Sequence, residues 1–171
     1  MLLAERMRRF AGADLYVVIT EAFCDGRPAL TVLDAVLEAG VRLVQLREKD
    51  CADRELHARA LAFRERTQAY GALLIIDDRV DVALAAGADG VHLGEHDLPL
   101  DAARRIGPDL ILGASSHNLR EALAAQDAGA SYVNIGPVFA TQTKHVATGA
   151  IGPEAIDAIA PRLRIPFTTM G

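Results

Sequence analysis

The stretch EAGVRLVQL at residues 38–46 recurs twice in altered form, as AAGADGVHL at residues 85–93 and as DAGASYVNI at residues 127–135. Each copy carries an Ala-Gly pair, followed by a short aliphatic run that contains one polar residue. A glycine in the left-handed conformation commonly ends a helix, so each copy predicts the end of a helix and then a strand. The copies lie about two strand–helix units apart. The chain is therefore built from a repeated strand–helix unit.

Seven short apolar runs along the chain predict strands. Each shows little alternation between apolar and polar residues, which is typical of parallel strands that are covered on both faces. Helical segments lie between them, for example at residues 54–70 and 118–128. This alternation indicates an α/β fold with a parallel sheet. The expected strands are Leu15–Thr20, Leu43–Leu46, Leu73–Asp77, Gly90–Leu93, Leu110–Ala114, Tyr132–Gly136 and Pro166–Met170.

One polar residue follows five positions after each repeat glycine, and the three are Gln45, His92 and Asn134. They fall on the second, fourth and sixth predicted strands. In a TIM (β/α) barrel, alternate strands contribute side chains to the same interior layer. We therefore expect these residues to point inward at one level near the mouth. The alternative is a polar layer within the core in which each buried polar group has a hydrogen-bond partner.

Composition narrows the class of protein. The 171 residues fit a single domain, 1–171, and 51% of them are hydrophobic. The formal net charge of −5 argues against a nucleic-acid partner, and no apolar run approaches the roughly 18 residues that cross a membrane. The N-terminus is too charged for a secretory signal. With only Cys24 and Cys51 present, a disulfide framework is not expected. We expect a cytoplasmic protein.

Charged and hydroxyl residues follow five consecutive predicted strands, where barrel enzymes carry their chemistry. The cations Arg47, Lys49 and Lys144 are typical phosphate ligands, and the hydroxyls of Ser115, Thr141 and Thr143 add donors. Asp78 and Asp97 supply hard oxygen atoms of the kind that Mg²⁺ shares with substrate phosphates. Taken singly, each residue could instead be part of a solvated loop, and Asp78 could form a salt bridge with Arg79. The set as a whole predicts a metal-bridged diphosphate site.

Among the histidines, His117 is the best candidate for a general acid or base, because it follows the fifth strand beside two serines. His57 lies on a predicted helix, where a surface role is expected. His96 and His145 lie in loops. No Cys/His spacing typical of zinc sites is present.

These motifs resemble the thiamine phosphate synthase family, which includes thiazole tautomerases of the same fold. The resemblance extends from about Leu15 to the last residue. It is carried by QLREK at residues 45–49, DRVD at 78–81, GVHLG at 90–94 and TQTK at 141–144. The resemblance implies an enzyme that joins a pyrimidine diphosphate to thiazole phosphate with Mg²⁺. It releases pyrophosphate and gives thiamine phosphate, through a dissociative mechanism.

The resemblance also implies a role for each matching residue. Gln45, Arg47 and Lys49 would hold the pyrimidine diphosphate, and Asp78 and Asp97 would bind Mg²⁺. Further substrate contacts would come from Asp77, Ser115, Thr141, Thr143, Lys144 and Gly171, with Thr141, Thr143 and Gly171 on the side of the thiazole phosphate. The catalytic set would be Lys49, Ser115, Lys144 and His117.

The sequence departs from the family pattern at several positions. Asp77 replaces the usual Asn and Glu95 the usual Gln, and Ala140 stands where a proline is common. An eight-stranded barrel needs about 200 residues or more, so we expect a barrel that lacks the C-terminal βα unit or units after the seventh strand. Without an eighth strand, the first and seventh strands would have unpaired edges, which a second copy of the chain could cover. Two alternatives stay open: a metal-free thiazole phosphate tautomerase that uses His117, and a non-catalytic paralogue that binds thiazole phosphate.

Overall fold

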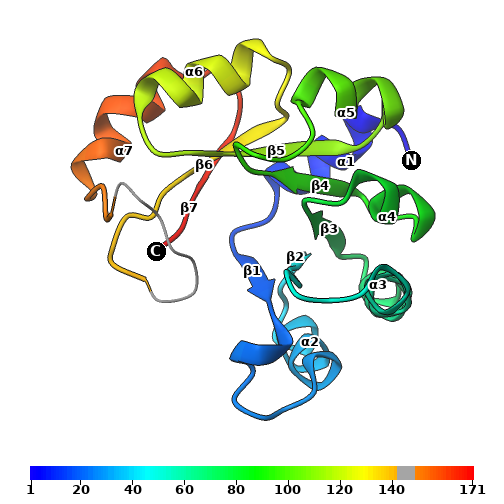
Figure 1. Ribbon diagram of the computed structural model, residues 1–171. Helices are drawn as coiled ribbons and strands as arrows, with labels where there is room; N and C mark the ends of the chain where they lie inside the picture. Colours follow the sequence, from blue (N-terminus) through cyan, green and yellow to red (C-terminus); the bar gives the residue numbers. More distant parts are fainter. Residues whose placement is uncertain (142–148) are drawn as a thin grey trace. The chain divides into compact units, whose positions relative to one another are not determined.

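The computed structural model describes residues 1–141 and 149–171 (Figure 1). Its strands form one seven-stranded sheet in chain order, β1 to β7. The strands are β1 (Tyr16–Ile19), β2 (Leu43–Leu46), β3 (Leu73–Asp77), β4 (Gly90–Leu93), β5 (Ile111–Ser116), β6 (Tyr132–Ile135) and β7 (Phe167–Thr169).

Helices alternate with these strands, as the sequence predicts. They are α1 (Leu3–Ala11), α2 (Ala29–Glu38), α3 (Asp53–Ala69), α4 (Val80–Ala85), α5 (Leu100–Ile106), α6 (Leu119–Asp127) and α7 (Glu154–Ile159), with short 3₁₀ turns η1 (Glu21–Phe23) and η2 (Ala160–Arg162). No helix in the described ranges is both long and apolar enough to cross a membrane.

The largest differences from the prediction lie at the end of the fifth strand and near the N-terminus. The fifth strand was predicted to end at Ala114, but β5 continues through Ser115 and Ser116. Both serines pair with β6, Ser115 opposite Asn134 and Ser116 opposite Ile135, so they belong to the sheet and not to the loop after it. Helix α1 was not predicted. Its helical pattern is interrupted by charge, and Phe10 is its one buried residue among those described.

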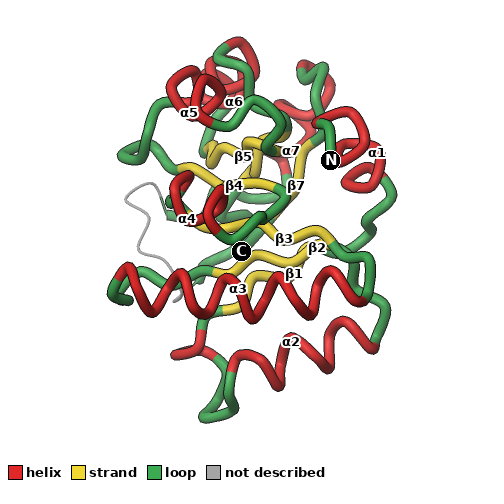
Figure 2. Tube along the Cα trace, turned by 90° about the vertical axis from the view of Figure 1, so that its right-hand side faces the viewer, coloured by secondary structure: helices red, strands yellow, loops and turns green. Residues whose placement is uncertain are grey.

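The chain divides into two compact units, which are described separately. The first comprises Met1–Val91 and Ile106–Ile111, and the second comprises His92–Arg105 and Leu112–Gly171. In the first unit, β1, β2 and β3 pair in parallel, with Val18 opposite Gln45 and Gln45 opposite Ile75. Helices α2 and α3 pack against each other and against these strands (Figure 2). Leu33, Leu37 and Phe63 from these helices are fully buried.

The second unit has two different strand faces. Ala114, Val133 and Ile135 pack against buried residues of α6 and α7, including Ala122 and Ile159. Side chains alternate across a strand, so the neighbouring residues Ser115, Asn134 and Thr168 share the opposite face, where the register places them side by side. This second face carries the polar residues of the candidate site.

The repeat glycines have the predicted role. Gly40, Gly87 and Gly129 have φ values of 97°, 65° and 92°, in the left-handed region that favours glycine. Each follows the helix that precedes a strand. Two residues further on, the second and third copies carry Asp89 and Ser131, which accept hydrogen bonds from the backbone of Leu74 and Leu112 and from an arginine of an earlier helix. The second and third copies of the repeat therefore share these backbone and arginine contacts as well as their sequence pattern.

Candidate active site

The first unit brings four predicted site residues together at the ends of β2 and β3. Nζ of Lys49 lies 2.9 Å from Oδ2 of Asp77 and also pairs with the carboxylate of Asp78. Nε of Arg47 lies 3.6 Å from the same Asp77 oxygen. We call Arg47, Lys49, Asp77 and Asp78 the Lys49 cluster. Arg79, by contrast, pairs with Asp53 and Asp81.

Two features mark the acidic half of the Lys49 cluster. Oδ2 of Asp77 is buried and, among the described residues, lies near cations without a well-aligned hydrogen bond. Asp78 has a φ of 61°, a left-handed conformation that costs a non-glycine residue on the order of 1 kcal/mol. Strained backbone persists where its surroundings hold it, and such positions concentrate at functional sites.

The charge of Lys49 responds to both carboxylates. Burial acts to lower the pKa of the Lys49 ammonium, but the hydrogen bond to Asp78 and the ion pair with Asp77 outweigh it and the pKa is raised. The ammonium is therefore charged throughout the neutral range. An extra carboxylate at position 77 would repel a bound diphosphate unless cations offset it. Lys49 and Arg47 lie close enough to Asp77 to offset its charge.

Gln45 is buried and donates from Nε2 to the hydroxyl of Tyr16, 2.7 Å away on β1. This contact matches the alternative for the repeat polar residues, in which each finds a partner on a neighbouring strand. Its role toward a substrate stays a prediction.

In the second unit, His92 joins three strands. Its Nε2 lies 3.0 Å from Oγ of Ser115 on β5, and its Nδ1 lies 2.9 Å from the hydroxyl of Tyr132 on β6. The Tyr132 ring occupies space above Gly113, where an added Cβ would come within 2.3 Å of the phenol oxygen. Glycine at position 113 therefore allows Tyr132 to reach His92. Ser115, a predicted catalytic residue, is oriented by this arrangement.

Asn134 accepts a hydrogen bond of 3.0 Å from Oγ1 of Thr168 on β7. Ser115 lies opposite Asn134 in the strand register and bonds to His92. Within the second unit, His92 and Asn134 therefore share one level, as the repeat predicted, and strand β5 contributes to that level as well. Each has a polar partner, so the layer is internally bonded.

His117 follows β5 and is tied to the start of α6. Its Nδ1 lies 2.9 Å from Oε2 of Glu121, which also accepts the His117 backbone N–H at 2.8 Å. The Asn118 side chain in turn accepts the Glu121 backbone N–H at 3.0 Å. This pattern resembles a helix-capping box, except that Glu121 bonds to the backbone of the residue before the N-cap Asn118. The histidine is held as part of the cap.

The remaining predicted residues have separate positions. Oδ2 of Asp97 accepts the Gly94 backbone N–H at 2.6 Å within its own loop. Gly171 has a φ of 118°, and an added Cβ would come within 2.7 Å of the Val138 backbone nitrogen, so only glycine fits there. Thr141 is half-buried. Thr143 and Lys144 lie outside the described residues.

The residues present fit a hard divalent cation in part. Asp77 and Asp78 place carboxylates at one strand end, one of them with a buried oxygen that lacks an aligned partner. The described residues hold no group of three or more ligating side chains. Magnesium needs only one or two carboxylates when substrate phosphates complete its shell. The donor set of the first unit is therefore compatible with a cation whose remaining ligands come from substrate phosphates.

Sequence reasoning missed several residues that shape the site. Three such residues were not among the predicted site residues: Tyr132, Glu48 and Glu121. Tyr132 bonds to His92, Glu121 bonds to His117, and Glu48 bonds to the backbone of Glu21. The spacing of four residues between His117 and Glu121 would have indicated their contact. Tyr132 lies two residues before Asn134 and thus on the same strand face. For Glu48 the sequence offers no comparable signal.

Comparison with known proteins agrees with this geometry. The family model described as thiamine monophosphate synthase matches residues 15–171. The chain belongs to the thiamine monophosphate synthase family. The thiamine-phosphate synthase of Chloroflexus aurantiacus is 44% identical over 157 residues, which cover 92% of this chain and 73% of that protein. The synthase of Caldicellulosiruptor saccharolyticus is 39% identical over 168 residues, with 98% and 76% covered.

A solved structure of this family confirms the fold. The thiamine phosphate pyrophosphorylase of Pyrococcus furiosus superposes with a TM-score of 0.83 at 38% identity, over 91% of this chain and 73% of that one. The predicted family and the predicted (β/α)-barrel architecture are thus confirmed.

Proposed function

We propose that this chain condenses a pyrimidine diphosphate with thiazole phosphate, forming thiamine phosphate and releasing pyrophosphate. Membership of the thiamine monophosphate synthase family supports this transferase reaction. The observation that carries it is the Lys49 cluster, in which two cations and two carboxylates meet at the ends of β2 and β3.

Arg47 and Lys49 act on the diphosphate. In a dissociative reaction, the carbon–oxygen bond to pyrophosphate breaks first and negative charge grows on the leaving group. Fixed cations aimed at that charge stabilise the transition state more than the ground state. The thiazole nitrogen then forms the new carbon–nitrogen bond. Because the leaving group departs before the thiazole nitrogen attacks, the reaction needs no nucleophile from the cluster, whose task is charge stabilisation and alignment.

The metal ion in this proposal is Mg²⁺, for which the family resemblance assigns Asp78 and Asp97 as the residues that would bind it together with the substrate phosphates. When bound, it would neutralise charge on the pyrophosphate as that group departs. Asp77, whose oxygen is buried beside Lys49, would compete with the diphosphate for the charge of the ammonium.

The second unit supplies the other proposed contacts. Ser115 presents its hydroxyl from β5 while His92 and Tyr132 fix its orientation. Thr141, Thr143, Lys144 and Gly171 would bind the phosphate groups, and Gln45 would contact the pyrimidine. The proposed substrates are small molecules. The proposed location is the cytoplasm, where free cysteines such as Cys24 and Cys51 are the usual state.

The test is a pyrophosphate-release assay with both substrates and Mg²⁺. We expect turnover that needs all three components. Lys49→Gln should lower kcat by about a hundredfold, the usual effect of removing one group that stabilises transition-state charge. The exposed Arg105→Gln, which breaks only a surface pair with Asp101, is the control and should behave like the parent. Absence of pyrophosphate release would reject the proposal.

The tautomerase alternative depends on His117 as a proton shuttle. In the structure, Glu121 engages both the ring and the backbone of His117 as part of a helix cap, an arrangement that a structural role explains. The synthase is therefore the proposed function. Isomerisation of the thiazole phosphate that is lost in His117→Gln and unaffected in Asp78→Asn would favour the alternative instead.

A further inference from the structure

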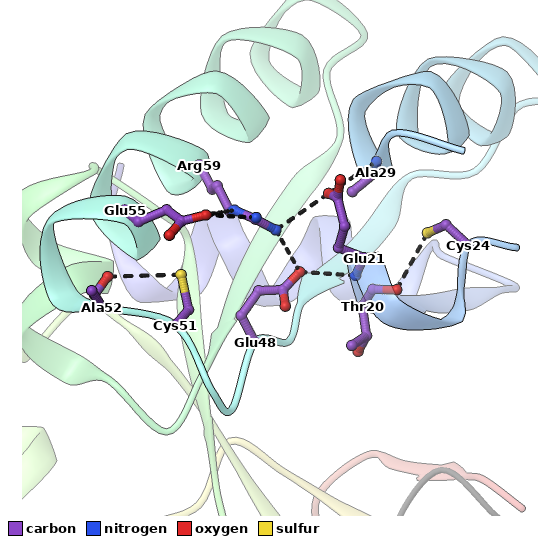
Figure 3. Close-up of polar contacts among 9 residues, drawn as sticks. All are labelled: Thr20, Glu21, Cys24, Ala29, Glu48, Cys51, Ala52, Glu55 and Arg59. Carbon is purple, nitrogen blue, oxygen red and sulfur yellow. Dashed lines mark hydrogen bonds and ion pairs between the residues drawn. The ribbon is translucent and has the colours of Figure 1, made fainter. Parts of the chain in front are cut away.

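Glu48 stands between Arg47 and Lys49 in the chain, but its side chain turns away from the Lys49 cluster. It is 10% exposed, and its Oε1 accepts a hydrogen bond of 2.9 Å from the Glu21 backbone N–H and one of 3.1 Å from Arg59 (Figure 3). Arg47 and Lys49 instead both reach toward Asp77. Of these three consecutive residues, Arg47 and Lys49 contact Asp77, whereas Glu48 contacts Glu21 and Arg59.

Arg59 lies in the middle of α3 and joins segments that are distant in the sequence. Its guanidinium contacts Glu48 at 3.1 Å, Glu21 at 3.2 Å and Glu55 at 2.7 Å (Figure 3). Oε2 of Glu21 also accepts the Ala29 backbone N–H at the start of α2, at 3.2 Å. We call these four charged residues, Glu21, Glu48, Glu55 and Arg59, the Arg59 network. It connects the loop after β2 to α2, α3 and the loop after β1.

Charge explains why the network holds its shape. One guanidinium faces three carboxylates, and the planar fork of arginine donates in several directions at once. The hydrogen bond to Glu55 raises the pKa of Arg59 against the opposing effect of burial, and Glu48 and Glu21 raise it further. The cation therefore persists at every working pH. The Arg47 backbone N–H also bonds to the Ile19 carbonyl at 2.9 Å, which fixes the base of the same loop.

We propose that Glu48 and Arg59 are positioning residues for the diphosphate-binding cations. By holding the central side chain of the 47–49 segment on the α3 side, they direct Arg47 and Lys49 toward Asp77 and the bound diphosphate. This inference rests on the proposed function. Misplacement of such groups by about 1 Å can cost on the order of a hundredfold in rate, so a contact outside the cluster is able to control catalysis.

A merely structural ion-pair network makes a different prediction. If the Arg59 network only stabilises the fold, its loss would lower the unfolding temperature and change the KM of both substrates alike. If it positions the cations, its loss raises the KM for the pyrimidine diphosphate selectively, because only that substrate is bound by Arg47 and Lys49.

The experiment compares Arg59→Gln, Glu48→Ala and the double variant with the parent chain. We expect each single variant to raise the KM for the diphosphate by about tenfold to a hundredfold, with the KM for thiazole phosphate within about twofold. The double variant should be no worse than the more severe single one, because both remove the same contact. Glu55→Gln is the matched control. It removes a carboxylate from the same guanidinium but leaves the loop contact, and its KM values should stay at the parent level.

Other outcomes overturn the inference. Unchanged KM for the diphosphate in both single variants, equal changes for the two substrates, or fully additive effects in the double variant would each do so. If Arg59→Gln fails to fold, Arg59→Lys and Glu48→Gln replace the pair. Lysine keeps the charge without the fork, so an intermediate rise in the diphosphate KM is expected, and a parent-like value would count against the proposal.

A binding measurement separates this inference from the proposed function. Calorimetric titration of the parent with Mg²⁺ and inorganic pyrophosphate needs no turnover. Arg59→Gln and Glu48→Ala should weaken pyrophosphate binding by the same order, about tenfold or more, and Glu55→Gln should not. Equal affinity in all four proteins would refute the positioning role. A parent that binds pyrophosphate but releases none from the two substrates would refute only the synthase activity.

Discussion

Nζ of Lys49 lies 2.9 Å from Oδ2 of Asp77 and at the same time pairs with Asp78, so one ammonium serves two adjacent carboxylates. The buried Asp77 oxygen has cations near it but no aligned hydrogen bond among the described residues. Lysine 49 is therefore held where an incoming diphosphate would compete with Asp77 for its charge.

Asp77→Asn tests this competition. Loss of the carboxylate removes a negative charge near the diphosphate and releases part of Lys49 for the substrate. We expect the KM for the pyrimidine diphosphate to fall by about threefold to tenfold, in line with an interaction of about 1 kcal/mol between the buried carboxylate and the half-exposed Lys49 ammonium. Steady-state kinetics at constant ionic strength provide the measurement, and a higher KM would show instead that Asp77 positions Lys49.

Gly113→Ala tests whether Tyr132 controls His92. The added Cβ would lie within 2.3 Å of the Tyr132 phenol oxygen and ring, so the ring must move away from His92. We expect a loss of about 1–3 kcal/mol in the free energy of unfolding, typical of overpacking, measured by urea titration. Gly12→Ala is the control, because its Cβ would meet only ordinary contacts at 3.7 Å. Equal stability of the two variants would contradict this account.

Much of the fold is predictable because short, continuous apolar runs alternate with longer helical segments. The strands at Leu43–Leu46, Leu73–Asp77 and Gly90–Leu93 have the predicted boundaries. The end of β5 was missed because Ser115 and Ser116 look like loop residues, while their pairing with β6 is a property of the assembled sheet. Polar residues at the end of a buried strand cannot be separated from a loop by composition alone.

The site was predictable to the extent that it lies at strand ends. Arg47, Lys49, Asp77 and Asp78 were expected together and the first unit brings them together. The supporting residues were not predictable, since their contacts cross between elements. Glu48 resembles any solvated glutamate in sequence, and only the fold shows that Arg59 of α3 reaches it.

The helix cap at α6 predicts a specific dependence of stability on pH. Burial acts to raise the pKa of Glu121, but hydrogen bonds from the His117 backbone, the His117 ring and Asn118 outweigh it, and the pKa is lowered. A carboxylate with a lowered folded pKa stabilises the protein above its unfolded pKa, and this stabilisation disappears as the pH falls through the folded value. Glu121→Gln should therefore unfold more easily than the parent at pH 7.

The difference between these two proteins should shrink as the pH is lowered from about 5 to about 3, where the carboxylate becomes protonated. Thermal unfolding across this range gives the measurement. Glu65→Gln, at an exposed position on α3, is the control and should follow the parent at every pH. A difference that grows in acid would mean that the Glu121 contacts do not favour the charged form.

The buried carboxylate of Asp89 makes the strongest prediction for stability. Its side chain is 0% exposed, and it accepts from Arg64 at 2.7 Å, from Arg6 of α1 at 3.4 Å and from the Leu74 backbone at 3.0 Å. Asp89→Ala leaves two guanidinium groups and a buried N–H without this partner, which should cost about 3–5 kcal/mol. Asp89→Asn keeps an oxygen for the Leu74 N–H and should lose less. Urea titration measures both variants, and Asp101→Ala, which breaks an exposed pair with Arg105, should stay within about 0.5 kcal/mol of the parent. If Asp89→Ala were as stable as Asp101→Ala, the attachment of α1 and α3 to the start of β4 would have to depend on apolar packing alone.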